Sequence, residues 1–160
     1  MAMSNSTIVL IHGGLYDESC LAPFIAALKT RSYQTVTRPL PAVSNPTPKS
    51  VDLSTNVDYV RSTLLALLLD EGKDIVIVMH SYGGLLGGPV VQGLCKTERA
   101  EEGKKGGILG LVFIVALIIP VDVSPLDGIG GPWDAVPHVF EDTCLPVISI
   151  LVSQAPEATT

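Results

Sequence analysis

The sequence predicts an α/β fold in which a mostly parallel sheet carries helices on both faces. Strand-like segments alternate with helical segments along the chain, and this alternation is typical of βαβ units. Each strand-like segment is a continuous run of Val, Ile and Leu, as expected for strands covered on both faces. The chain has 160 residues, of which 47% are hydrophobic and 16% charged. That length and composition suit one domain with a substantial core.

Five apolar runs predict the strands, at residues 7–11, 34–38, 74–79, 108–119 and 146–152. Apolar side chains at helical spacing predict helices over residues 21–30 and 50–72, and a third helix should follow the run 74–79, over residues 83–95. Ser50 is the expected cap of the second helix, and Gly72 is its expected end. The third helix should be weakened by Pro89 and the two glycines before it. Residues 41–49, rich in Pro, Ser and Asn, are expected to form a loop.

The composition changes near residue 120. Residues 1–120 hold four of the predicted strands, whereas the stretch that follows is dense in proline and glycine. We therefore expect a core over residues 1–120, and a loop-rich, cap-like segment with a C-terminal tail over residues 121–160.

Charge and cysteine usage exclude several classes of protein. The net charge is −6, and no cluster of Lys and Arg interleaved with aromatic residues occurs, so nucleic acid is not an expected partner. Cys20, Cys95 and Cys144 are odd in number and lack a CxxC spacing. We expect neither a disulfide framework nor a zinc site from them, and they suit a reducing compartment. The first residues lack the features of a signal peptide, so a cytoplasmic location is expected.

Two further patterns suggest a membrane span or a nucleotide site. Residues 106–121 carry no charge, but a spanning helix needs about 20 apolar residues, and the β-branched content of this run favours a buried strand. Four glycines between Gly83 and Gly88 follow a strand, but neither G-x-G-x-x-G nor a P-loop lysine occurs. We therefore expect no membrane contact, no cofactor and no metal.

Ser81 is the candidate catalytic residue. It follows the apolar run 74–79 and precedes a glycine-rich helix start, with Gly83 two positions later. Such a strand–turn–helix lifts a serine hydroxyl out of the sheet and turns the next backbone N–H, here that of Tyr82, toward a developing oxyanion. The position two before the serine is usually small, whereas here it is Met79.

A second motif, His12-Gly13-Gly14, closes the first predicted strand. An oxyanion hole requires a second N–H from a loop after an earlier strand, and glycines allow the backbone to approach a substrate closely. Gly14 or Leu15 is the expected donor. A plain tight turn is the alternative interpretation of this motif.

These motifs resemble the α/β-hydrolase superfamily, and most closely a group of fungal esterase-like hydrolases. The resemblance rests on residues 8–14, 74–84 and 106–120, extends over residues 7–135, and is more distant to plant esterases and hydroxynitrile lyases. Met before His-Ser-Tyr-Gly-Gly is ordinary in the fungal group. The resemblance implies a Ser–His–Asp triad that hydrolyses a small, mostly apolar ester or lactone.

The remainder of a triad is harder to assign. Of three histidines, His12 belongs to the oxyanion loop and His80 adjoins the nucleophile, which leaves His138 as the candidate base. Asp122, just after the fourth strand, is the candidate acid, whereas surface or capping roles suit Asp127, Asp134, Glu141 and Asp142 better.

Only 79 residues follow Ser81, so we expect a C-terminally truncated hydrolase with an incomplete core. Two hypotheses stay open: a serine hydrolase, and a non-catalytic remnant that binds a small apolar ligand or a partner chain. The remnant would self-associate through an uncovered sheet edge. A lyase on the same fold is a further alternative.

Overall fold

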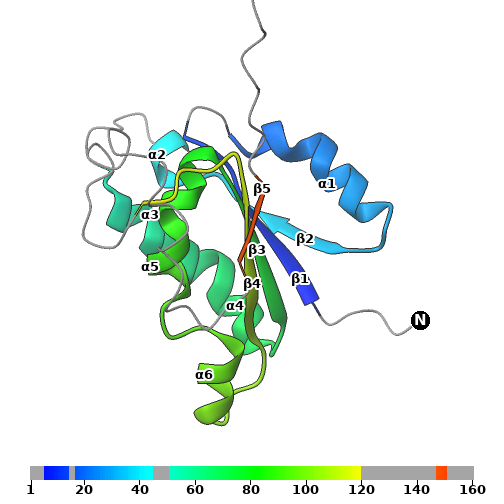
Figure 1. Ribbon diagram of the computed structural model, residues 1–160, viewed down its shortest axis with the longest axis vertical. Coiled ribbons are helices and arrows are strands. Elements are labelled where there is room, and N and C mark those ends of the chain that lie inside the picture. The colour runs from blue at the N-terminus through cyan, green and yellow to red at the C-terminus, as the bar shows by residue number, and fades with distance from the viewer. Residues whose placement is uncertain (1–5, 15–16, 45–50, 120–146, 151–160) are drawn as a thin grey trace, which may run out of the picture.

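The computed structural model describes residues 6–14, 17–44, 51–119 and 147–150. Five strands form one sheet in the order β2-β1-β3-β4-β5 (Figure 1), and all of their pairings are parallel. The strands are β1 (Ser6–Ile11), β2 (Gln34–Thr37), β3 (Asp74–His80), β4 (Gly107–Ile114) and β5 (Val147–Ile150). The predicted parallel sheet is confirmed.

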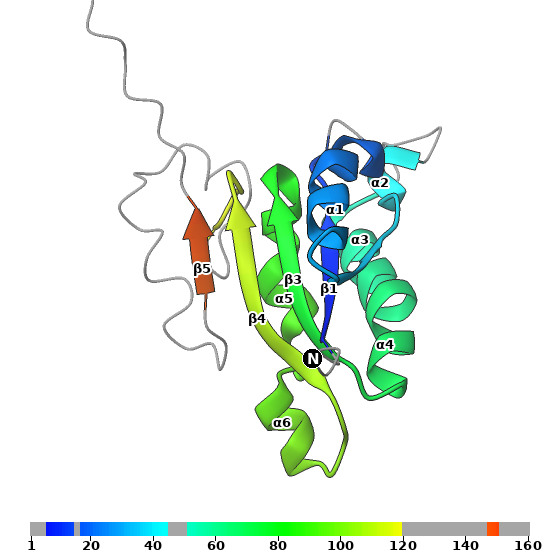
Figure 2. The same cartoon turned by 90° about the vertical axis from the view of Figure 1, so that its right-hand side faces the viewer.

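Helices cover both faces of the sheet, as predicted. The α-helices are α1 (Ala22–Lys29), α2 (Pro41–Ser44), α3 (Leu53–Tyr59), α4 (Ala66–Asp70), α5 (Gly87–Val91) and α6 (Lys96–Glu101). Figure 2 shows α1 in front of the sheet, whereas α3, α4 and α5 lie behind it. The core lies between the sheet and this second group, because no residue of α1 is fully buried. Alternate residues of β3, which are Ile75, Ile77 and Met79, are wholly inaccessible there.

The helix predicted over residues 50–72 begins later than expected and is interrupted by a π-helical turn. It begins at Leu53, because the carboxylate of Asp52 caps it, accepting from the Thr55 backbone N–H at 2.8 Å. Ser50, the predicted cap, lies outside the described residues. A π-helical turn, Val60–Leu65, joins α3 to α4. The helix ends as predicted at Gly72, whose φ of 71° places it in the left-handed region that favours glycine.

Two short helices occur where the sequence predicted connections. α2 occupies the first part of the expected loop at residues 41–49. α6 forms in the charged stretch before β4, where the Glu98 carboxylate accepts from the Cys95 N–H at 3.1 Å. Arg99 is buried and donates to the carbonyls of Leu69, Lys105 and Gly106. These local hydrogen bonds stabilise a helix that has little apolar periodicity.

β4 is shorter than the predicted strand at residues 108–119. It ends at Ile114, and Val115 has a φ of 44°, which is strained for a β-branched residue. The apolar run nevertheless stays partly buried beyond the strand, since Ala116 is only 8% exposed. A long apolar run therefore corresponds here to a strand followed by a packed turn.

Two further expectations concern membrane spans and the cysteines. Within the described ranges no helix is long and apolar enough to cross a bilayer. Cys20 is a free, exposed thiol, but Cys95 is disulfide-bonded. The sequence argued against a disulfide framework, and a single bond at Cys95 is no such framework, but an odd number of widely spaced cysteines does not exclude one bond. Disulfides are rare in reducing compartments, so these cysteines no longer support such a location.

Candidate active site

Ser81 lies in a strained turn at the carboxyl end of β3. His80 keeps an extended backbone, with φ −115° and ψ 136°, whereas Ser81 has a φ of 52°. A 3₁₀ turn, Ser81–Leu86, follows directly and leads into α5. A non-glycine residue in the left-handed region costs free energy, and such strain often marks a functional site. The local geometry is that of the predicted strand–turn–helix.

The two glycines after Ser81 are required by close backbone contacts. A Cβ on Gly83 would lie 2.9 Å from the carbonyl oxygen of Ile11. A Cβ on Gly84 would lie 2.4 Å from the carbonyl oxygen of Leu117. The turn is thus pressed between the end of β1 and the chain that follows β4. The Leu117 N–H also donates to the Ser81 carbonyl at 2.9 Å, which fixes the turn from the β4 side.

Met79 is accommodated by a glycine in the next helix. Its side chain is wholly buried, and its sulfur would lie 3.1 Å from a Cβ built on Gly87. Phe113 approaches the same point to 3.1 Å. The bulk that the turn usually avoids two positions before the serine is therefore directed into the core, where Gly87 leaves room for it.

The loop after β1 adjoins both Ser81 and Tyr82. A Cβ on Gly13 would lie 3.1 Å from the Ser81 Cβ and 3.5 Å from its Oγ. A Cβ on Gly14 would lie 3.3 Å from both Cβ and Cγ of Tyr82. The structure thus brings together the two motifs that the sequence singled out. Leu15, the alternative oxyanion donor, lies outside the described residues.

His12 is wholly buried and holds this loop in place. Its Nε2 accepts a hydrogen bond from the Leu40 backbone N–H at 3.0 Å, and its Nδ1 lies 2.7 Å from the Gly13 carbonyl oxygen. A nitrogen that accepts cannot carry a proton, so the proton is on Nδ1, which donates to Gly13. Both nitrogens are therefore committed to backbone groups, and His12 has a structural role.

Asn56 is a buried side chain of the site that the sequence analysis did not identify. Its Nδ2 donates to the Tyr82 hydroxyl at 3.0 Å and to the Asp52 carbonyl at 3.2 Å, and its Oδ1 accepts from the Ala42 N–H at 3.1 Å. Burial raises the pKa of Tyr82, although the hydrogen bond from Asn56 lowers it. The signal was available, because Asn56 is a polar residue on the apolar stripe formed by Leu53 and Val60.

The described residues do not include the candidate base and acid. His138 and Asp122 both lie outside the described residues, so their roles stay predictions. His80 directly precedes Ser81, and its Nδ1 is buried without a hydrogen-bond partner among the described residues. No group of three or more His, Cys, Asp or Glu side chains in the described ranges could hold a metal ion.

Comparison with known proteins gives one family. A family model described as the alpha/beta hydrolase family matches residues 8–154. The chain is 31% identical over 130 residues to a probable hydrolase of Phoma sp., and 24% identical over 122 residues to an alpha/beta hydrolase of Aspergillus novofumigatus. These alignments cover 81% and 76% of this chain but 50% and 47% of the two relatives. The chain therefore spans about half the length of the curated relatives it matches.

Solved structures share the fold. Polyneuridine aldehyde esterase aligns with a TM-score of 0.58 and 18% identity, over 81% of this chain and 49% of its own. Tomato methylketone synthase I aligns with a TM-score of 0.56 and 15% identity, over 87% and 49%. A pyrethroid hydrolase from Sphingobium faniae aligns with a TM-score of 0.50 and 22% identity, over 75% and 44%. At these identities the likeness concerns the fold alone.

Proposed function

Since this chain belongs to the alpha/beta hydrolase family, we propose that it is a serine hydrolase whose nucleophile is Ser81. The observation that carries the proposal is the left-handed φ of Ser81, 52°, in a turn between β3 and a 3₁₀ helix. The loop of Gly13 and Gly14 lies against that turn. Strain of this kind persists only where the surrounding structure enforces it. Here the end of β1, the loop after it and the chain after β4 all contact the turn.

The proposed reaction is acyl transfer through Ser81. The hydroxyl oxygen attacks the carbonyl carbon of an ester or lactone while its proton passes to an imidazole, which we assign to His138 with Asp122 as the orienting acid. The electron pair of the C=O bond moves to oxygen, where the N–H groups of Tyr82 and of Gly14 or Leu15 stabilise it. The alkoxide then leaves with the imidazolium proton, and water releases the acid from the acyl-enzyme.

The substrate we propose is a small, mostly apolar ester or lactone. Ser81 lies beside Gly13, and the apolar Ala116, which is 8% exposed, lies against Gly84 in the same turn. Such surroundings favour an apolar acyl group. Solved relatives are named as an aldehyde esterase and a pyrethroid hydrolase, which agrees with an ester substrate. We propose that the reaction needs no cofactor.

The test is covalent labelling of the full chain by a fluorophosphonate probe. Labelling is expected on Ser81 and should disappear in Ser81→Ala. Ser62→Ala is the matched control, because the Ser62 hydroxyl donates to the Asp58 carbonyl within a helix far along the chain, and it should leave labelling unchanged. Absence of labelling in folded wild-type protein would refute the proposal.

The roles proposed for His138 and Asp122 have their own test. His138→Ala should lower the labelling rate by a factor of about 100 or more, the usual contribution of a general base. Asp122→Asn should lower it less than His138→Ala does, since the acid acts through the imidazole. An unchanged rate in His138→Ala would assign the proton transfer to another group.

A non-catalytic binding protein is the second candidate. Phe24 and Tyr33 are 38% and 47% exposed. Tyr33 directly precedes β2, which ends the described sheet with β1 as its neighbour. An apolar patch beside a sheet edge favours self-association or capture of an apolar ligand or partner chain. Sedimentation analysis should then give a mass that rises with concentration, and Phe24→Ser should reduce this rise. A strictly monomeric wild-type protein would exclude self-association.

A further inference from the structure

We propose that the Tyr82 side chain is a positioning residue that couples the two oxyanion donors, with Asn56 as its anchor. The inference rests on the proposed function, because it gives the contacts of Tyr82 with Gly14 and Asn56 a role in oxyanion binding. Neither residue would touch the substrate through its side chain. Their effect would be to fix the spacing between the Tyr82 N–H and the N–H of the loop after β1.

The first contact joins Tyr82 to the oxyanion loop. A Cβ built on Gly14 would lie 3.3 Å from both the Cβ and Cγ of Tyr82, and 3.7 Å from its Cδ1. The loop backbone therefore packs directly on the base of the tyrosine ring. Since both predicted donors are backbone groups, this contact determines how near Gly14 can come to residue 82.

The second contact fixes the far end of the ring. Asn56, which is wholly buried, donates to the Tyr82 hydroxyl at 3.0 Å. Its other two hydrogen bonds, to Asp52 and from Ala42, tie it to the start of α3 and to α2. All of these bonds join Asn56 to backbone atoms or to the hydroxyl, so its amide has a single orientation. The ring is thus held at both ends.

A ring held in this way couples the position of the Gly14 backbone to that of the residue 82 backbone. Rotation of the Tyr82 side chain about its Cα–Cβ bond would move the Cγ and Cδ1 atoms that lie beside Gly14, and the loop could then shift relative to the backbone of residue 82. Oxyanion donors act only when they lie about 2.7–3.1 Å from the charged oxygen. A misplacement of about 1 Å can cost two orders of magnitude in rate.

The kinetic test uses two near-isosteric substitutions. Tyr82→Phe keeps the ring contact with Gly14 but removes the hydroxyl, and Asn56→Leu removes the anchor. Each should lower the fluorophosphonate labelling rate about 10-fold. The double variant should be no slower than Asn56→Leu, because that substitution already removes the hydrogen bond to the Tyr82 hydroxyl. Tyr33→Phe, which removes an exposed hydroxyl, should have no effect.

A second readout works without turnover. In amide NMR spectra of the full chain, Tyr82→Phe and Asn56→Leu should each shift or broaden the amide signals of Gly14 and residue 82, and leave the exposed Gly88 unchanged. Unchanged Gly14 and residue 82 signals in both variants would overturn the inference. If wild-type protein fails to label while the amide signals still respond, the proposed function fails and the coupling stands. Normal labelling in both variants, with labelling in the wild type, would overturn the positioning role alone.

Discussion

The backbone N–H of Leu40 donates to the Nε2 of His12 over 3.0 Å, inside the protein. Leu40 follows β2 and His12 follows β1, so this hydrogen bond joins the loops at the carboxyl ends of the two strands. It also selects the imidazole tautomer that donates to the Gly13 carbonyl. The loop of Gly13 and Gly14 is thus supported by the segment that follows the neighbouring strand β2, and not by its own sequence alone.

Replacing His12 should destabilise the fold. His12→Ala leaves the buried Leu40 N–H without a partner and opens a cavity, so the free energy of unfolding should fall by about 3 kcal/mol in urea titration. His12→Gln can still offer a carbonyl oxygen and should recover part of the loss. Equal stability of the two variants would mean that the Leu40 hydrogen bond contributes little.

Gly84→Ala should be strongly destabilising. The added Cβ would lie 2.4 Å from the Leu117 carbonyl oxygen and 2.8 Å from the Ala116 Cβ, so backbone has to move, at a cost of roughly 3 kcal/mol. Gly88→Ala is the matched control: it lies in α5 with no atom within 4 Å of the added Cβ. It should gain about 0.5–1 kcal/mol from reduced chain entropy. Thermal unfolding of both variants measures the contrast.

The Asp52 cap predicts a pH dependence of stability. Hydrogen bonds from the Thr55 N–H and hydroxyl and from the Ser54 hydroxyl lower the pKa of Asp52 from 3.8 to about 2. The folded state therefore favours the charged carboxylate, and the stabilisation is complete above about pH 4 and lost as the pH falls toward 2. The difference in urea midpoint between wild type and Asp52→Ala should be present at neutral pH and vanish in acid. A difference independent of pH would contradict the charged cap.

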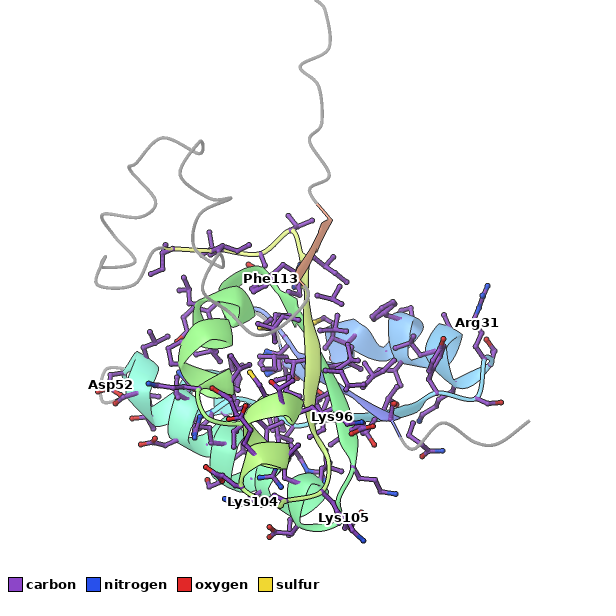
Figure 3. The ribbon with its side chains drawn as sticks, turned by 60° about the horizontal axis from the view of Figure 1, so that its bottom comes forward. Arg31, Asp52, Lys96, Lys104, Lys105 and Phe113 are labelled. Carbon is purple, nitrogen blue, oxygen red and sulfur yellow. The ribbon has the colours of Figure 1, made fainter. Side chains whose placement is uncertain are left out.

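Arg61, which lies in the helical segment before β3, should stabilise α5. Its guanidinium donates to the carbonyls of Pro89, Val90 and Gln92, at 3.2, 2.8 and 2.9 Å. These carbonyls lie at the end of α5, where a cation also complements the helix dipole. Arg61→Met should lower the unfolding free energy by about 1–2 kcal/mol. Arg31→Met is the control, since Arg31 extends away from the sheet (Figure 3) and its loss should change stability by no more than about 0.5 kcal/mol.

The parallel sheet could be predicted because its strands are continuous apolar runs. In β3, burial on both faces requires Val, Ile and Met at nearly every position, and the run from Ile75 to Met79 meets that requirement. The position of Ser81 followed from this strand and from the glycines after it. Those glycines are needed for sterically specific reasons, which the contacts of Gly83 and Gly84 explain.

Other elements could not be predicted because non-local contacts decide them. Nothing in the local sequence ends the apolar run at Ile114, where the chain turns so that Leu117 can bond to the Ser81 carbonyl. The short helix α6 depends on a capping bond and on Arg99, whose three carbonyl acceptors come from other segments. The role of Asn56 likewise appears only once α2 and the turn after Ser81 lie beside it.

The hydrogen bond from the Leu117 N–H to the Ser81 carbonyl has a practical consequence for chimeras. Through this bond, and through the contact of Leu117 with Gly84, residues 115–119 help to hold the turn at Ser81 although they follow β4 in the chain. A segment grafted from a relative after β4 should therefore be joined beyond residue 119. A graft that begins at Val115 would replace part of the support that holds Ser81 in its strained conformation.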